Sequence, residues 1–294
     1  MKIDSACILE DRGILFVEGP DAKDFLQNII TNDIEKVTEN SSCFASLLSP
    51  QGKFLFDFII IKHKKGYLID CEKDQIDELY KKLSLYKLGS EIKILNLSNE
   101  FVVVALSYEK FISINDSQDK LGFTLKFRED PILLDPRNKK LGARLIINLE
   151  KFYLSVKKLN IKPINQKEYY ELSFELGIAQ KNTHKLKDKI FGIECNFEEL
   201  NGIDFHKGCY VGQENTARIK LRNKLTKRLL PIKVIEGKIK EGDTIFVENK
   251  EVGKVLIDEN YPFAIIKFTS ENFDFNSIFN VKKAKIKLIK PSWL

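Results

Sequence analysis

Short apolar runs separated by turn residues dominate the first third of the chain, and their spacing predicts strands with two helices between them. Residues 6–9 and 14–17 predict a hairpin that turns at Asp11-Arg12-Gly13. After the break at Gly19-Pro20, apolar positions recur with a helical period, so we expect a helix over 21–30 with Asp21 as its cap. The pattern therefore begins as mixed α and β structure.

The same reading continues to residue 177 with alternating strands and helices. Residues 108–130 are polar and lack a period, which predicts an irregular surface excursion. Gly177 is expected to end the last helix of this part. The expected strands are 43–48, 54–61, 67–71, 91–97, 101–106 and 143–148, and the expected helices are 74–86 and 166–176.

From Lys227 onward the pattern changes to short runs in which apolar and polar residues alternate, at 229–235, 244–248, 252–257, 263–268 and 285–289. Several short strands separated by turn residues indicate a small antiparallel barrel or sandwich. We therefore predict two domains, residues 1–225 and 226–294, which suits a chain of 294 residues.

Composition narrows the class of protein. No run of 18 residues lacks charge, so a membrane-spanning helix is not expected, and Met1-Lys2-Ile3-Asp4 does not resemble a secretory signal. The five cysteines form no Cys-x-x-Cys pair, which favours a reducing compartment, and we expect the cytoplasm. No cluster of His, Cys or Asp has metal-ligand spacing, so no protein-held metal is expected.

The net charge of +6 is mild, and the basic residues are scattered, so there is no strong nucleic-acid signal. One denser stretch contains Arg218, Lys220, Arg222, Lys224, Lys227 and Arg228. A solvated face is one interpretation of this stretch. An anion site for a polyglutamate tail, phosphate or RNA is the other.

The segment Lys207-Gly208-Cys209-Tyr210-Val211-Gly212-Gln213-Glu214 carries the most specific chemistry. Gly208 and Gly212 allow a sharp turn, and a helix is expected to begin near Gly212. A thiol just before a helix start, with the cation of Lys207 nearby, favours thiolate at Cys209. A single cysteine is otherwise an inert small hydrophobe, but these neighbours are polar and rich in glycine.

This segment resembles the signature of the YgfZ-type folate-binding proteins, which include mitochondrial iron–sulfur maturation factors and are relatives of the glycine-cleavage T-protein, an aminomethyltransferase. Further segments resemble the family at 19–27, 31–33, 48–57, 135–144, 218 and 228. The resemblance implies an α+β, T-protein-like folate-binding fold with ferredoxin-like segments and a small C-terminal β-barrel. Its departure at 173–179, where the family's Arg and Pro are missing, concerns the fine geometry of the pocket.

The resemblance also implies site residues. Glu194 occupies the position of the carboxylate that grips the pterin ring, and a carboxylate can accept two parallel hydrogen bonds from an aminopyrimidine edge. A solvated loop glutamate is the alternative. Asp57 falls near the catalytic aspartate of T-proteins, and its place in an apolar strand requires a partner. We expect both carboxylates to point into one cavity.

The remaining candidates complete a site for tetrahydrofolate or a derivative. The candidate catalytic residues are Cys209 and Asp57, and the candidate folate-binding residues are Asn32, Asp57, Glu194, Lys207, Tyr210, Gln213 and Arg218. Asn32 has an alternative role in turning the chain after the first helix.

Three functions stay open. The first is a tetrahydrofolate-binding accessory protein that supports assembly or repair of iron–sulfur enzymes, including tRNA-modifying ones, through reactive Cys209. Its partners would be reduced folate and iron–sulfur proteins or their assembly factors. The second is a tetrahydrofolate-dependent aminomethyltransferase, against which the single acid in Phe56-Asp57 counts, since T-proteins carry two adjacent acids there. The third is a non-catalytic scaffold.

Overall fold

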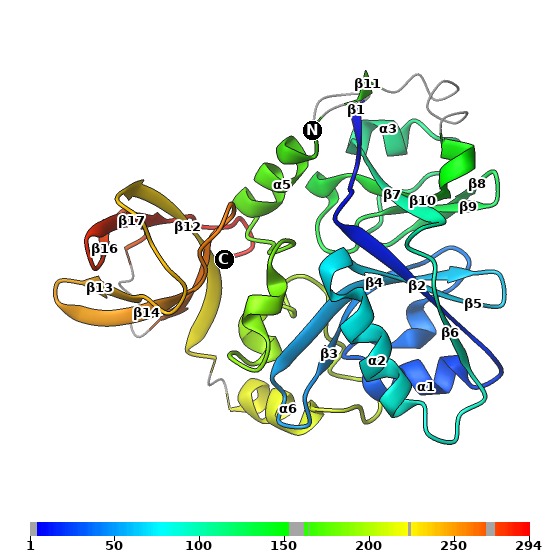
Figure 1. Cartoon of the computed structure of the whole chain (residues 1–294), viewed down its shortest axis with the longest axis horizontal. Helices are drawn as coiled ribbons and strands as arrows, with labels where there is room; N and C mark the ends of the chain where they lie inside the picture. The colour runs from blue at the N-terminus through cyan, green and yellow to red at the C-terminus, as the bar shows by residue number, and fades with distance from the viewer. Residues whose placement is uncertain (1–4, 153–161, 164, 223–224, 269–273) are drawn as a thin grey trace. The chain divides into compact units, whose positions relative to one another are not determined.

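The structure is a computed structural model that describes residues 5–152, 162–163, 165–222, 225–268 and 274–294 (Figure 1). The chain divides into two compact units, each built from several stretches of sequence. Unit 1 comprises Met1–Leu48, Phe56–Tyr169 and Glu198–Val211, and unit 2 comprises Ser49–Leu55, Tyr170–Phe197 and Gly212–Leu294. Lys224, one of the residues of the basic stretch, lies outside the described residues. The predicted division at residue 225 stays a prediction.

A five-stranded antiparallel sheet holds the first half of unit 1. Its strand order is β3-β4-β5-β2-β6, and register pairs such as Ile14 with Asp70 fix which side chains share a face. Helix α2 contacts β2 and β6. The strands are β2 (Arg12–Glu18), β3 (Cys43–Leu48), β4 (Phe54–His63), β5 (Gly66–Glu72) and β6 (Lys93–Asn96), and the helices are α1 (Ala22–Ile29), α2 (Ile76–Tyr86), η1 (Ile34–Lys36) and η2 (Lys73–Gln75).

Helix α1 confirms the predicted helix over 21–30, because Phe25, Leu26 and Ile29 form its buried face. The predicted cap is wrong. The Asp21 carboxylate makes no capping bond to α1 and accepts a hydrogen bond from the Glu91 backbone N–H at 2.7 Å instead. Because the Asp21 carboxylate is used by this distant N–H donor, it does not cap the N-terminus of α1.

A second sheet completes unit 1, with the strand order β11-β1-β7-β10-β9-β8. The predicted hairpin of residues 6–9 with 14–17 is wrong, because β1 pairs with β7 in this sheet whereas β2 pairs with β5 and β6 in the other. The expected irregular stretch 108–130 is partly wrong, because α3 caps itself through Ser107 and buries Phe111 fully against this sheet. The elements are β1 (Ser5–Ile8), β7 (Phe101–Leu106), α3 (Tyr108–Ile112), β8 (Thr124–Phe127), β9 (Asp130–Leu134), η3 (Lys139–Leu141), β10 (Ala143–Asn148) and β11 (Lys162–Pro163).

A buried set of charges joins the two sheets of unit 1, and we call it the Arg–Asp network: Arg12, Asp70, Asp135, Arg137 and Arg144. Arg12 Nε lies 2.6 Å from Asp70 Oδ1, and Arg137 Nη2 lies 2.7 Å from Asp135 Oδ2. Arg144 pairs with both aspartates and donates to the Tyr169 hydroxyl at 2.9 Å.

Every member of the network is at most 7% exposed, so each charge depends on its neighbours for solvation. Burial by itself would raise the pKa of Asp70, but the adjacent guanidinium groups of Arg12 and Arg144 outweigh it and hold that pKa below its usual range. The pKa of Asp135 is lowered in the same way, against burial, by Arg137 and Arg144. Both aspartates are therefore ionised in the folded chain.

Unit 2 contains a closed barrel with the strand order β12-β15-β14-β13-β16-β17, which confirms the predicted C-terminal β-barrel. Inward side chains such as Leu230, Val255 and Ile266 fill it. Its strands are β12 (Lys227–Glu236), β13 (Thr244–Val247), β14 (Lys250–Ile257), β15 (Phe263–Lys267), β16 (Phe279–Val281) and β17 (Ala284–Leu288).

The rest of unit 2 packs around short helical segments. Gly177 ends helix α5 with φ of 73°, and a Cβ there would lie 2.4 Å from Cγ of Pro291. The Trp293 indole donates to the Leu176 carbonyl at 2.9 Å, which holds the last residues against the end of α5. The helices are α5 (Gln166–Glu175), whose first residues belong to unit 1, η4 (Thr183–Leu186), η5 (Gly192–Cys195) and α6 (Gln213–Leu221).

Candidate functional site

The loop that carries Cys209 is anchored in unit 1 by the segment after helix α1. The Thr31 hydroxyl donates to the Gly202 carbonyl at 2.6 Å, and the Asn32 amide donates to the Asn201 carbonyl at 2.8 Å. Asp204 N–H donates in turn to the Thr31 carbonyl at 3.0 Å. Asn32 therefore holds the chain in place, the alternative role that its sequence context left open.

Lys207 fixes the same loop by capping α1. Its ammonium donates to the carbonyls of Gln27, Ile30 and Asn32 at 2.7, 2.7 and 2.8 Å. The last carbonyls of a helix have no partner within the helix and carry partial negative charge, so a cation satisfies them. Burial lowers the pKa of Lys207 to about 8. The lysine that was expected to supply a cation beside the thiol is thus engaged with helix-end carbonyls.

Cys209 itself is exposed, whereas Cys7, Cys43, Cys71 and Cys195 are all buried. Burial raises the pKa of Cys7 and of Cys43 to about 12, and it raises the pKa of Cys71 further, so these thiols stay protonated. A Cβ placed on the neighbouring Gly208 would meet nothing within 4 Å, so the space beside that residue is open. Tyr210 is buried, with its ring centroid 5.1 Å from the Lys207 ammonium.

Helix α6 begins at Gln213, as expected, after Gly212 with φ of 83°. Within unit 2, its first turn contacts the turn at 49–53, another segment on which the resemblance rests: Asn215 donates to the Gln51 carbonyl at 2.8 Å. Arg218 is exposed and donates to the Asn215 side chain at 2.5 Å, and Gln213 is half-buried. These two candidates share one helix.

Glu194 lies on η5 in unit 2. Its Oε2 accepts a hydrogen bond from the Phe191 backbone N–H at 2.8 Å, which orients the carboxylate, and among the described residues Oε1 has no hydrogen-bond donor. The side chain lines a cavity of about 320 Å³ together with Lys53, Phe191 and other residues of the same unit. A carboxylate held in a cavity of this size fits a ligand with several N–H donors.

Asp57 lies on β4, half-buried, in unit 1. Because side chains alternate along a strand and Ile59 pairs with Asp70, Asp57 shares its sheet face with Asp70 of the Arg–Asp network. Glu194 belongs to the other unit, so the shared cavity expected for the two carboxylates stays a prediction.

Asp70 and Arg12 were not among the predicted site residues. The signal was present, since Asp70 interrupts the apolar strand Tyr67-Leu68-Ile69 in the same way that Asp57 interrupts its own. A buried acid requires a cation, and Arg12 lies 58 positions away in sequence. An acid within an apolar strand can be identified from the sequence, but the sequence does not show that Arg12 is its partner.

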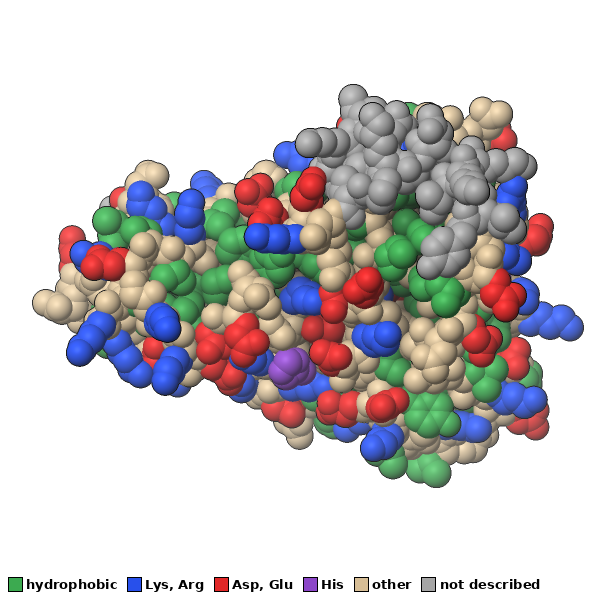
Figure 2. All heavy atoms as spheres, turned by 45° about the horizontal axis from the view of Figure 1, so that its top comes forward, with side chains coloured by type: hydrophobic (Ala, Val, Ile, Leu, Met, Phe, Trp, Pro, Cys, Tyr) green, Lys and Arg blue, Asp and Glu red, His purple; other side chains and the backbone are tan. Residues whose placement is uncertain are grey.

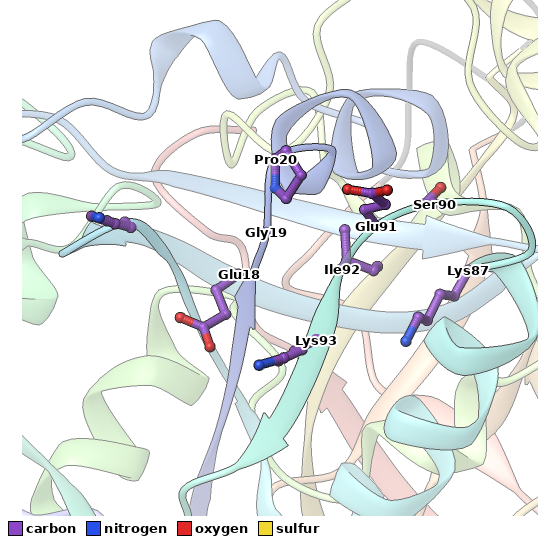
Figure 3. A pocket seen from close by; sticks show the side chains of 9 residues that line it. Glu18, Gly19, Pro20, Lys87, Ser90, Glu91, Ile92 and Lys93 are labelled. Atoms are coloured by element: carbon purple, nitrogen blue, oxygen red, sulfur yellow. The ribbon is translucent and has the colours of Figure 1, made fainter.

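A larger cavity, of about 800 Å³, lies in unit 1 and contains none of the predicted site residues (Figure 3). It is lined by Glu18, Gly19, Pro20, Lys65, Lys87, Ser90, Glu91, Ile92 and Lys93. Its lysines and glutamates are mostly exposed and of mixed sign. On the face shown in Figure 2, basic and acidic side chains are likewise interspersed, which agrees with a mild net charge.

Two absences concern only the described part of the chain. Within it, no three His, Cys, Asp or Glu side chains lie where they could share a metal ion. Across the same residues, every helix is too short or too polar to cross a lipid bilayer.

Comparison with known proteins gives clear relatives, although no family model matches the chain. It is 29% identical over 252 residues to the "Iron-sulfur cluster assembly factor IBA57 homolog, mitochondrial" of Dictyostelium discoideum, which covers 76% of this chain and 61% of that protein. The protein of the same name from Neurospora crassa is 30% identical over 230 residues, with 76% and 52% covered. The chain thus spans about half to three fifths of the length of these relatives.

The fold matches the crystal structure of glycine cleavage system aminomethyltransferase T from Bartonella henselae, with a TM-score of 0.75 at 12% identity. The match covers 99% of this chain and 86% of that one. The predicted α+β, T-protein-like fold is confirmed, and so is the resemblance to relatives of the iron–sulfur maturation factors.

The expected cytoplasmic location is contradicted, because the curated relatives are named mitochondrial proteins. The expectation rested on unpaired cysteines, which the structure keeps as five free thiols. Free thiols indicate a reducing compartment but do not distinguish one such compartment from another.

Proposed function

We propose that this relative of the iron–sulfur cluster assembly factors, with the fold of a glycine-cleavage aminomethyltransferase, binds tetrahydrofolate or a derivative and supports assembly or repair of iron–sulfur enzymes. Enzymes that modify tRNA are included among those served. Reduced folate and iron–sulfur proteins or their assembly factors are the partners, and the mitochondrial location of the relatives is part of the proposal.

The observation that carries the proposal is the contrast between Cys209 and the other four cysteines. Cys209 is exposed on a loop held by Lys207, while the other thiols are buried. A thiol reacts or binds iron as thiolate, and it must be reachable by a large partner. The loop before Cys209 is anchored at Gly202 by Thr31 and at Lys207 by helix α1. These contacts hold the thiol in position without covering it.

The folate part of the proposal rests on Glu194 and its cavity. The Phe191 N–H fixes one carboxylate oxygen, so the other can accept from an aminopyrimidine edge. Asn32, Asp57, Lys207, Tyr210, Gln213 and Arg218 are proposed as further folate-binding residues. When bound, the reduced folate would supply one-carbon or reducing chemistry, and the residues named here would bind and orient it.

The decisive experiment is complementation with Cys209→Ser in cells that lack the endogenous relative. We expect the variant to fold, to keep folate binding and to fail to restore the activity of iron–sulfur enzymes. Cys195→Ala is the matched control, since Cys195 is buried and its removal should leave complementation intact. Full complementation by Cys209→Ser would mean that the thiol is structural, and it would favour the scaffold function.

Folate binding is tested separately with Glu194→Gln, which keeps an acceptor for the Phe191 N–H but removes the charge. We expect tetrahydrofolate monoglutamate to bind about thirtyfold more weakly, which is the loss of roughly 2 kcal/mol from a charge-assisted contact. Unchanged affinity in calorimetry would remove Glu194 from the site.

An aminomethyltransferase is the second candidate, and the fold similarity favours it. In that function Asp57 would position the reacting amine of tetrahydrofolate. The test is transfer of a one-carbon unit from an aminomethyl-lipoyl carrier, with Asp57→Asn beside the unchanged chain. Turnover that Asp57→Asn abolishes would favour this function over the first.

A further inference from the structure

The cavity beside Glu194 is lined by more positive charge than its one carboxylate can balance. Four lysines reach it from separate segments, together with apolar side chains of Ile190, Leu256 and Ile265: Lys53, Lys189, Lys227 and Lys254. We call these four residues the lysine cluster. All of them belong to unit 2, and the cavity has a volume of about 320 Å³.

Strand alternation builds one wall of the cavity. Lys254 pairs with Ile265 across β14 and β15, and Leu229 pairs with the same Ile265 from β12. Lys227 lies two positions before Leu229, so it shares that outward face. The inward neighbours Val255 and Ile266 fill the barrel core instead. The register therefore places two lysines of adjoining strands around an apolar patch.

The other two lysines of the cluster, Lys53 and Lys189, lie outside the barrel strands and have defined contacts. The Lys53 ammonium lies 3.7 Å from the centroid of the Phe191 ring and donates to the Lys189 carbonyl at 3.4 Å. The Lys189 ammonium pairs with Glu241. The aromatic face and the carbonyl orient the Lys53 side chain, and the carboxylate of Glu241 orients that of Lys189.

Lys227 and Lys254 differ from that pair. In the described part of the chain, neither ammonium has an ion pair or a hydrogen-bond partner. Lys227 is half-buried and Lys254 is exposed. Lys189 already pairs with Glu241, so the ammonium groups of Lys53, Lys227 and Lys254 share a single lining carboxylate, Glu194, and like charges gathered in a cavity repel one another. A bound anion would relieve that repulsion.

We propose that this cavity binds a small oligoanion, meaning two or more carboxylate or phosphate groups in succession. Two sources share this chemistry. One is the γ-linked glutamate tail of a folate, which deepens and rests on the function proposed above. The other is a free oligoanion such as pyrophosphate. The apolar patch of Ile190, Leu256 and Ile265 suits the carbon stem of the first source.

The test compares two double variants that remove the same charge from the same barrel. Lys227→Gln/Lys254→Gln removes two members of the lysine cluster. Lys233→Gln/Lys287→Gln is the control, because these two exposed lysines pair across β12 and β17 and do not line the cavity. The ligands for calorimetry on the whole chain are 5-formyltetrahydrofolate monoglutamate, its pentaglutamate, free tri-γ-glutamate and pyrophosphate.

We expect the pentaglutamate to bind about tenfold more tightly than the monoglutamate to the unchanged chain and to the control, and with no such advantage to Lys227→Gln/Lys254→Gln. Binding of pyrophosphate alone, lost only in that variant, supports the proposal with a free oligoanion as the source. The proposal is overturned if no oligoanion binds, or if both double variants lose affinity equally.

Glu194→Gln separates this inference from the proposed function. Removing the only lining carboxylate removes repulsion, so tri-γ-glutamate and pyrophosphate should bind a few times more tightly. The monoglutamate should bind more weakly if Glu194 contacts the pteridine. Oligoanion binding without any folate binding overturns the proposed function and retains the cavity, whereas weaker oligoanion binding to Glu194→Gln overturns the cavity.

Discussion

The Arg–Asp network of unit 1 and the lysine cluster of unit 2 both gather charge, but they solve the resulting electrostatic problem in opposite ways. In the network every buried cation faces a buried carboxylate, as where Arg144 lies between Asp70 and Asp135. In the cluster, Lys227 and Lys254 face a cavity with one carboxylate among its lining residues. The first arrangement completes itself within the chain, and the second is completed by something from outside.

The difference teaches how to distinguish structural charge from binding charge. Buried charges that all pair with one another indicate a role in the fold, since removing one residue leaves its partner as an uncompensated buried charge. Charges of one sign that gather at the edge of a cavity without partners in the chain indicate a binding site for a ligand of opposite charge. Lys207 lies between these cases, because its partners are uncharged carbonyls.

The largest effect is expected from Arg144→Met, which breaks the network at its centre. It leaves the buried carboxylates of Asp70 and Asp135 short of a cation, so the free energy of unfolding should fall by about 3–5 kcal/mol in urea denaturation. Arg222→Met removes an exposed arginine and should cost less than about 0.5 kcal/mol.

A double variant sharpens this result. Asp70→Asn together with Arg144→Met removes both members of one pair, so its cost should be smaller than the sum of the single costs. Additive costs would mean that the two side chains do not depend on each other, and the comparison with the lysine cluster would then fail.

An intermediate effect is expected from Lys207→Met, which uncaps helix α1 and releases the loop of Cys209. Loss of three hydrogen bonds from a charged donor should lower the free energy of unfolding by about 1–3 kcal/mol. Lys81→Met, at an exposed lysine of α2, is the matched control. Equal urea midpoints for the two variants would show that the cap contributes nothing.

The pH dependence of the same residue has a definite sign. Burial lowers the pKa of Lys207 to about 8 in the folded chain, below the usual 10.5, so between these values the unfolded chain binds more protons. Stability therefore rises with pH through that window, and below pH 8 this group contributes no slope. The urea midpoint of the unchanged chain, measured relative to that of Lys207→Met, should therefore increase between pH 7.5 and 9.5. A falling difference would contradict the assignment.

The smallest effect is expected from Lys227→Gln/Lys254→Gln in the absence of ligand. Relief of repulsion should raise the free energy of unfolding by no more than about 0.5 kcal/mol at low salt, and added salt should remove the gain. A loss of stability instead would mean that these lysines, like Arg144, are paired within the fold.

The elements that local pattern determines could be predicted from the sequence. Phe25, Leu26 and Ile29 predicted α1, and the alternating runs after Lys227 predicted the barrel. Strand β16 was missed because Phe279–Val281 is too short for its alternation to stand out. Helix α3 was missed because its buried face has one main contributor, Phe111, within a polar stretch.

In the candidate site, too, features that depend on local sequence could be predicted, whereas those that depend on distant contacts could not. The exposure of Cys209 followed from its glycine-rich neighbours, which are local. The partners of Lys207 lie 175 to 180 positions earlier in the chain, and the four members of the lysine cluster come from segments far apart. Spacing in one sequence cannot supply contacts of this kind, because they depend on how the sheets and loops are closed.

The interleaving of the two units has a consequence for how the chain is made. Unit 1 needs Glu198–Val211, and unit 2 needs Ser49–Leu55 from near the beginning of the chain. During synthesis, which proceeds from the N-terminus, unit 1 is therefore incomplete until Val211 has been added, and Ser49–Leu55 must await the barrel strands that follow. Unit 1 is therefore complete in sequence before the barrel strands of unit 2 are made, and the loop of Cys209 is the last part of unit 1 to be synthesised.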